Sequence, residues 1–155
     1  RETGESVNLA VPLGREALYL DQVEGTKLVR LFTAPGSRAP LHATGVGKVF
    51  LAYLGVPEGL SLTPYTPHTL TRLPDLLREL EAVRGRGYAL DNEEKELGVR
   101  CVAAPVFGAS GGVVAALSLS APASRLSLEE AHRLAPRVVE AARRASLRLG
   151  YTGEV

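Results

Sequence analysis

The sequence has no methionine, no tryptophan and a single cysteine, Cys101. One cysteine excludes an internal disulfide and is too few for a cysteine-rich zinc site, so a reducing cytoplasm is the expected compartment. No apolar run approaches the roughly 20 residues that a membrane-spanning helix requires. No basic start precedes an apolar stretch, as it would in a signal peptide. We therefore expect a soluble, cytoplasmic protein with no membrane partner.

An excess of basic residues is also missing, because 18 Lys and Arg stand against 17 Asp and Glu. Non-specific nucleic-acid binding needs a broad positive surface, so this chain is not expected to hold DNA by itself. Its 155 residues fit one domain, 1–155, with a packed core. Since the chain opens on Arg1 and contains no methionine, we expect it to be a fragment of a longer protein.

The pattern of apolar residues predicts a mixed α/β (α+β) domain. Alternation predicts strands at 7–12, 17–23, 27–32, 88–91, 99–107 and 113–120. Helical spacing predicts helices at 45–54, from Pro74 to Gly85 or Gly87, and after Ser127, which forms a capping box with Glu130. Short turns join neighbouring strands, which favours an antiparallel sheet with helices packed on it, as in GAF and PAS sensor domains.

The strand that ends at Ser120 separates two kinds of side chain. Leu117 and Leu119 point to one face, while Ser118 and Ser120 share the other face with Ala116. The serines could simply face water, as on the open side of many antiparallel sheets. Alternatively, short side chains leave a hollow above the sheet, where two hydroxyls could bind a guest molecule.

Cys101 shares a strand face with Val99 and Ala103, an environment typical of a small core residue. A nucleophilic role would require a nearby histidine to activate the thiol. The spacing of the three histidines suggests no such pair; they are His42, His68 and His132. Covalent catalysis is therefore disfavoured.

The segment Gly45-Val46-Gly47-Lys48 resembles the end of a phosphate-binding loop. The Walker pattern requires Ser or Thr after the lysine, and Val49 stands there instead, so a nucleotide site is improbable. The free N–H groups at a helix start still attract anions, and a carboxylate would suit this position.

Asp91 ends a predicted strand beside the charged loop 92–96. Its simplest role is to cap or solvate that turn, and Arg100 could pair with the loop. Asp91, His42 and the pair Glu93-Glu94 show no metal-ligand spacing, so no metal site is expected.

Five segments, in this order, resemble the C-terminal effector-binding domain of IclR-family transcription regulators, which is GAF-like. They are 3–9, 41–48, 87–94, 98–106 and 118–126. The resemblance implies a homodimer or homotetramer with a winged helix-turn-helix domain before Arg1, through which DNA is bound. It also implies that the domain binds a small effector, uses no cofactor and no metal, and performs no catalysis. The helix start at Gly45 indicates that this effector is a small carboxylate.

The family's motifs assign effector contacts to positions of this chain. The polar end of the effector would meet Gly45, Val46, Asp91, Cys101, Ser118 and Ser120, and the apolar wall would be Leu28, Leu31 and Val99. Two alternatives remain at this stage: an oligomerisation module with no small ligand, and a GAF-like enzyme that uses Cys101.

Overall fold

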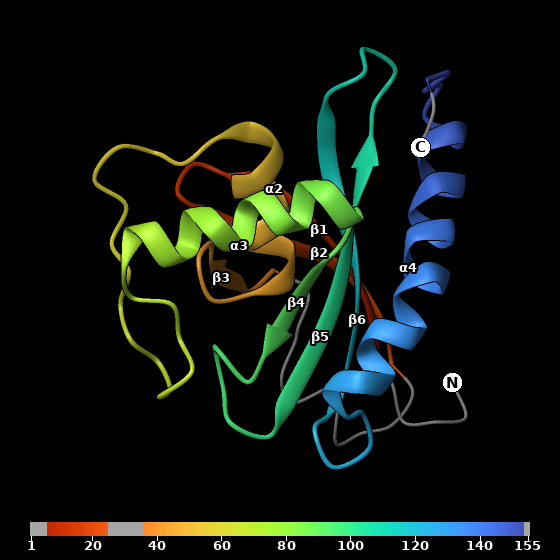
Figure 1. Ribbon diagram of the computed structural model, residues 1–155. Helices are drawn as coiled ribbons and strands as arrows, with labels where there is room; N and C mark the ends of the chain where they lie inside the picture. The colour runs from red at the N-terminus through yellow and green to blue at the C-terminus, as the bar shows by residue number, and fades with distance from the viewer. Residues whose placement is uncertain (1–5, 25–35, 154–155) are drawn as a thin grey trace.

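The computed structural model describes residues 6–24 and 36–153. In this part of the chain, six strands form one antiparallel sheet in the order β3-β2-β1-β6-β5-β4 (Figure 1). The strands are β1 (Ser6–Leu13), β2 (Glu16–Glu24), β3 (Arg38–Pro40), β4 (Ala89–Asn92), β5 (Val99–Phe107) and β6 (Val113–Pro122). The helices are α2 (Gly45–Leu54), α3 (Leu73–Arg86) and α4 (Leu128–Arg148). The predicted fold class is confirmed.

The two predicted hairpins, β1–β2 and β5–β6, are present. The strand predicted at 27–32, which contains Leu28 and Leu31, lies outside the described residues. The edge strand β3 was not predicted from the sequence, because it has three residues and ends in Pro40. Proline lacks a backbone donor and is tolerated at a sheet edge, where one side of the strand needs no partner.

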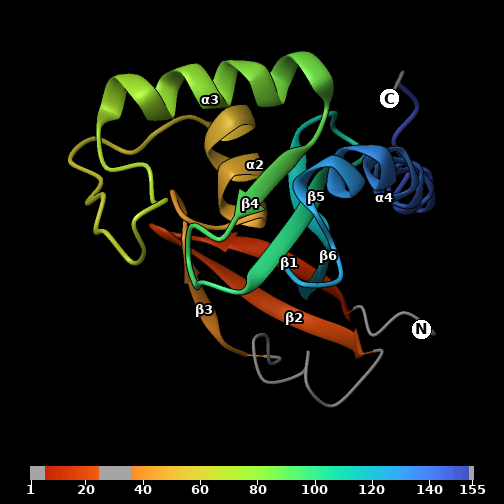
Figure 2. The same ribbon diagram turned by 60° about the horizontal axis from the view of Figure 1, so that its bottom comes forward.

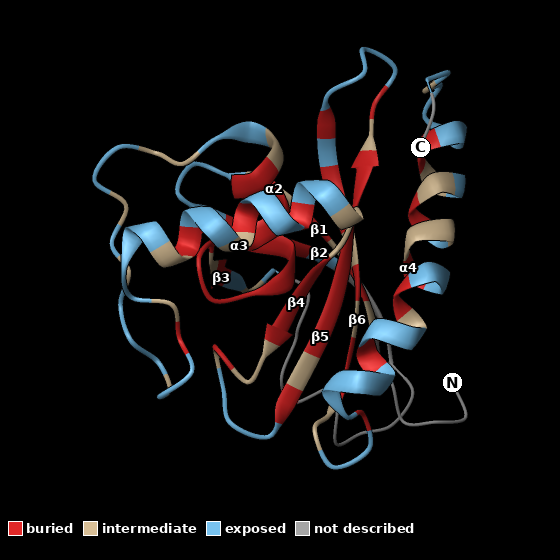
Figure 3. Ribbon diagram, viewed as in Figure 1, coloured by how far each residue is buried: buried red, intermediate tan, exposed pale blue. Residues whose placement is uncertain are grey.

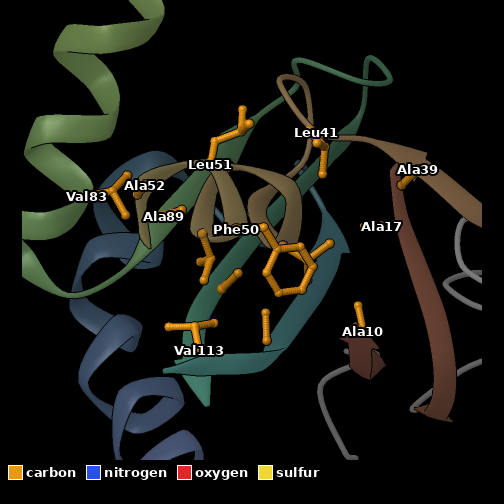
Figure 4. Close-up of a cluster of buried hydrophobic side chains, with 14 of the residues drawn as sticks. Ala10, Ala17, Ala39, Leu41, Phe50, Leu51, Ala52, Val83, Ala89 and Val113 are labelled. Carbon is orange, nitrogen blue, oxygen red and sulfur yellow. The ribbon is translucent and has the colours of Figure 1, made fainter. Parts of the chain in front are cut away.

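One face of the sheet is covered by α2, and α3 packs on α2 (Figure 2). Small side chains on the strands allow α2 to approach closely: Ala10, Ala17 and Ala103 meet Phe50 and Leu51 in one apolar cluster (Figure 4). The outer layer follows the predicted pattern, since Leu76, Leu80 and Val83 of α3 are buried. Of the two predicted ends of α3, Gly87 is correct, with a left-handed φ of 87° that glycine adopts without strain.

The opposite face of the sheet is covered by α4, which begins at the predicted capping box of Ser127 and Glu130. Its buried side chains recur every three to four residues; they are Ala131, Ala135, Val138, Ala142 and Ser146. The outward side of α4 is exposed (Figure 3). No helix in the described part of the chain is long and apolar enough to cross a membrane.

Candidate ligand-binding site

The register of the sheet brings three predicted site residues into one row. Asp91 on β4 stands opposite Cys101 on β5, and Cys101 stands opposite Ser120 on β6. The next row contains Ala103 and Ser118, which are also partners. Because side chains alternate along a strand, all of these share the face of Ala103, which belongs to the cluster under α2. Asp91, Cys101, Ser118 and Ser120 therefore line one patch beneath the helical layer.

This patch is not exposed to water. Ser118 is 3% exposed and Ser120 is 1% exposed. The interpretation in which the serines face solvent is therefore wrong, because helices cover both faces of this sheet. Polar groups buried under a helix must find hydrogen-bond partners in the protein, in water or in a ligand.

The start of α2 lies directly against the patch. A Cβ atom added to Gly45 would stand 3.1 Å from the Cβ of Ala103, so glycine permits this close approach. Thr44 is the N-cap, and its hydroxyl accepts the backbone N–H of Gly47 at 3.1 Å. The N–H groups of Gly45 and Val46 lie in the first turn, where the helix supplies no acceptor. The positive end of α2 is thus placed beside the row of Ser118.

Ser120 connects the strands through its hydroxyl. The Nδ2 of Asn8, on β1, donates to Ser120 Oγ at 3.4 Å, and Cys101 Sγ lies 3.0 Å from the same oxygen. The Oδ1 of Asn8 is buried and has no hydrogen-bond partner within the part of the chain that the structure describes. An unsatisfied buried acceptor costs about 1–3 kcal/mol, so this atom marks a position where a donor is missing.

Asp91 is held by the turn that follows β4. Its Oδ1 accepts the backbone N–H of Glu94 at 2.8 Å, and Glu93 adopts a left-handed φ of 57° in that turn. The predicted capping role is therefore correct, but the carboxyl is only 3% exposed and is not solvated. Burial, and then the charge of Glu94, raise the pKa of Asp91 to about 7. The Asp91 carboxyl thus exchanges its proton near neutral pH.

Lys48 is fully buried on α2 and binds the same turn. Its Nζ donates to both carboxylate oxygens of Glu94, at 2.9 and 3.1 Å, and lies 3.5 Å from Glu79 of α3. The lysine of the Gly45–Lys48 segment is therefore occupied by internal carboxylates, which agrees with the rejection of a nucleotide site. Arg100 pairs with Glu93 at 3.1 Å, as proposed from the sequence.

The family model described as "Bacterial transcriptional regulator IclR C-terminal" matches residues 1–147. The chain belongs to the IclR family. It corresponds to the C-terminal, effector-binding domain of these regulators, as the motifs in the sequence indicated.

Individual proteins support the assignment. XynR, an HTH-type transcriptional regulator of Escherichia coli, is 40% identical over 97% of this chain. The crystal structure of Thermotoga maritima IclR superposes with a TM-score of 0.87 at 39% identity, over 96% of the chain. The chain spans 62% of the length of XynR and 63% of the Thermotoga protein.

A third relative is described with a ligand. The inducer-binding domain of PobR from Acinetobacter, a double mutant in complex with 3-hydroxybenzoic acid, superposes with a TM-score of 0.76 at 29% identity. This chain covers 87% of that domain, and the match includes 94% of this chain.

The site of this IclR domain lacks the groups that would activate its cysteine. Burial and the neighbouring Asp91 raise the pKa of Cys101, so the thiol stays protonated. His42 contacts the carbonyl of Thr63, His132 contacts Tyr88, and His68 is exposed. No group of three metal-binding side chains occurs in residues 6–24 and 36–153.

The remaining predicted residues differ in outcome. Val46 is buried in the core cluster, so its side chain supports α2 and only its backbone can face a ligand. Val99 precedes Cys101 by two residues on β5, so its side chain points to the same face of the sheet, and it is 7% exposed. Leu28 and Leu31 lie outside the described residues.

Two site residues were missed by the sequence reasoning. Asn8 alternates with Val7 and Leu9 as Ser118 alternates with Leu117 and Leu119, so the same pattern could have identified it. Tyr19 on β2 is 8% exposed. Burial, with smaller contributions from Cys101 and Asp91, raises its pKa, so the phenol keeps its proton. No local signal distinguishes Tyr19 from an ordinary strand tyrosine.

Proposed function

We propose that this IclR-family domain binds a small carboxylic acid between the first turn of α2 and the sheet. The carboxylate accepts the N–H groups of Gly45 and Val46, while Asp91, Cys101, Ser118 and Ser120 supply further polar contacts. Val99 forms part of the apolar wall. Leu28 and Leu31, which the sequence also assigns to this wall, lie outside the described residues.

The observation that carries this proposal is the row of buried polar groups at the positive end of a helix. Asp91 and Ser120 are 3% and 1% exposed, in a layer built mostly from alanine, valine and leucine. The first turn of a helix favours an anion by about 0.3–1 kcal/mol, and more when partly buried. Asp91 can keep its proton near neutral pH, so it can donate to a carboxylate. The PobR complex with 3-hydroxybenzoic acid provides a related domain with an acid.

In this proposal, the effector acts by changing the relative populations of two arrangements of domains. A ligand that binds one arrangement of domains more tightly than another shifts the equilibrium towards it. XynR is described as an HTH-type regulator, and this chain covers 62% of it. We infer that a DNA-binding domain outside this chain responds to the effector, in a homodimer or homotetramer, with no cofactor and no chemical conversion of the ligand.

Calorimetric titration of the chain with a panel of small carboxylates tests this proposal. At least one acid should bind with 1:1 stoichiometry, and Ser118→Leu should weaken that acid at least tenfold because it removes a hydroxyl and places a larger apolar side chain against the proposed contacts. Ser124→Leu makes the same change at an exposed turn and should bind normally. Binding of no acid, or equal binding by Ser118→Leu, would reject the site.

The two alternative functions, an enzyme that uses Cys101 and an oligomerisation module without a ligand, predict different results in these measurements. An enzyme that uses Cys101 would turn over the bound acid and lose turnover in Cys101→Ser, although the thiol here is protonated and has no histidine partner. An oligomerisation module without a ligand would bind no acid at all.

A further inference from the structure

Asn8 presents a buried acceptor that no described residue of the chain satisfies. Its side chain is 1% exposed and its Nδ2 donates to Ser120 Oγ at 3.4 Å. Among residues 6–24 and 36–153, its Oδ1 has no hydrogen-bond partner. Asn8 stands opposite Ser118 on the face that carries the proposed carboxylate contacts. We propose that Asn8 Oδ1 accepts a hydrogen bond from a hydroxyl of the effector, so that the site selects hydroxy carboxylic acids. This inference rests on the proposed function.

The direction of the hydrogen bond follows from the donors already in use. Ser120 Oγ accepts the amide of Asn8, and its proton is then free for Cys101 Sγ, 3.0 Å away. The carbonyl end of the Asn8 amide is therefore the free end, and it can only accept. A ligand hydroxyl satisfies it, whereas a ketone in the same place would set two acceptors against each other.

The strand spacing indicates where this hydroxyl stands relative to the carboxylate. Gly45 lies over Ala103 of β5, and Asn8 belongs to β1, with β6 between them. Two strand spacings are roughly 9.6 Å, and a hydrogen bond of about 2.9 Å at each end leaves at most about 4 Å between the carboxylate and the hydroxyl, because the Asn8 side chain reaches towards Ser120 of β6. This separation suits a hydroxyl on the third carbon of the acid better than one on the second.

Three acids of equal chain length test this inference on the unmodified chain: butyrate, 3-hydroxybutyrate and 3-oxobutyrate. Calorimetric titration should show that 3-hydroxybutyrate binds about fivefold or more tightly than either of the other two, as one added net hydrogen bond provides. In Asn8→Leu, which keeps the size of the side chain and removes its amide, the three affinities should converge. Asn92→Leu makes the same change on the other face of the sheet, where Asn92 accepts Arg100, and should retain the preference.

The outcomes separate this inference from the proposed function. If butyrate and 3-hydroxybutyrate bind equally, or 3-oxobutyrate binds best, the site takes acids but Asn8 does not select a hydroxyl. If Asn8→Leu folds, binds acids and keeps the preference, another group reads the hydroxyl. If neither these three acids nor any acid of the wider panel binds, both proposals fail.

Discussion

The pKa of Asp91 is set by its surroundings within the site. The carboxyl is buried on β4 beside Cys101, and burial is the main cause that raises its pKa from 3.8 to about 7, with Glu94 next. Below pH 3.8 the folded and unfolded chains both hold this proton. Between about 4 and 7 the unfolded chain releases it while the folded chain keeps it, so the contribution of Asp91 to stability falls as pH rises through this window. Above pH 7 the loss is complete.

Asp91→Asn should therefore stabilise the domain at pH 8 and change it little at pH 4. The amide oxygen can still accept the N–H of Glu94, while the buried charge is gone. We expect a gain in melting temperature on the order of 5 °C at pH 8, since about 2–4 °C corresponds to 1 kcal/mol in a domain of this size. Thermal denaturation followed by circular dichroism at both pH values measures this difference. Asp75→Asn changes a more exposed carboxyl on α3 and is the control; a gain for Asp91→Asn that is equal at pH 4 and pH 8 would contradict the assigned cause.

At the scale of elements, one buried ion pair joins α2 to the turn between β4 and β5. Lys48 contacts Glu94 at 2.9 Å and lies 3.5 Å from Glu79 of α3. Thr66, in the segment between α2 and α3, donates to the carbonyl of Glu93. The same turn supplies the N–H that holds Asp91. Lys48 thus links the helices α2 and α3 to the turn that holds Asp91 in the polar row.

Lys48→Met should destabilise the domain by about 3–5 kcal/mol, because it leaves the buried Glu94 carboxylate with the backbone N–H of Asn92 but without its cation. Adding Glu94→Gln should recover part of this loss, since it removes the unpaired charge. Arg78→Met removes an exposed ion pair with Asp75 within α3 and should cost about 0–1 kcal/mol. Urea denaturation of the four proteins gives these free energies of unfolding. Equal losses for Lys48→Met and Arg78→Met would show that burial does not strengthen this pair.

At the scale of the whole molecule, the near balance of charge bears on whether this chain binds DNA by itself. The formal net charge is +1, with 18 basic and 17 acidic residues. Several arginines are committed to carboxylates: Arg86 pairs with Glu79, Arg100 with Glu93, and Arg143 with Glu140. With a net charge of +1, the chain has little excess positive charge to replace the counterions of a DNA phosphate backbone.

This chain alone should bind duplex DNA no more tightly than about 10⁻⁴ M at physiological salt, the weak end of non-specific binding. Fluorescence anisotropy with a labelled 30-base-pair duplex measures this at several salt concentrations. Hen lysozyme, a basic protein of similar size, is a positive control for non-specific binding. Micromolar binding with a steep salt dependence would show that this domain contributes directly to the DNA interface.

Much of this architecture is local and could be predicted from the sequence. The capping box at Ser127, the N-cap Thr44 and the inward row of α3 each depend on residues within four positions of one another. The alternation that separates Ser118 from Leu117 is a property of a single strand. Helix and strand periodicities are set by backbone geometry, which is why these features appear without knowledge of the fold.

Other features depend on contacts between distant residues. Asn8 and Ser120 are 112 residues apart, and Lys48 and Glu94 are 46 apart. Register and burial decide such pairs, and no local pattern encodes them. The sequence by itself determined the family, most of the elements and the polar strand face. Only the tertiary structure decided that this face is buried, that Lys48 is paired with Glu94, and that no described residue donates to Asn8 Oδ1. Each of these facts depends on which strand or helix packs against the residue.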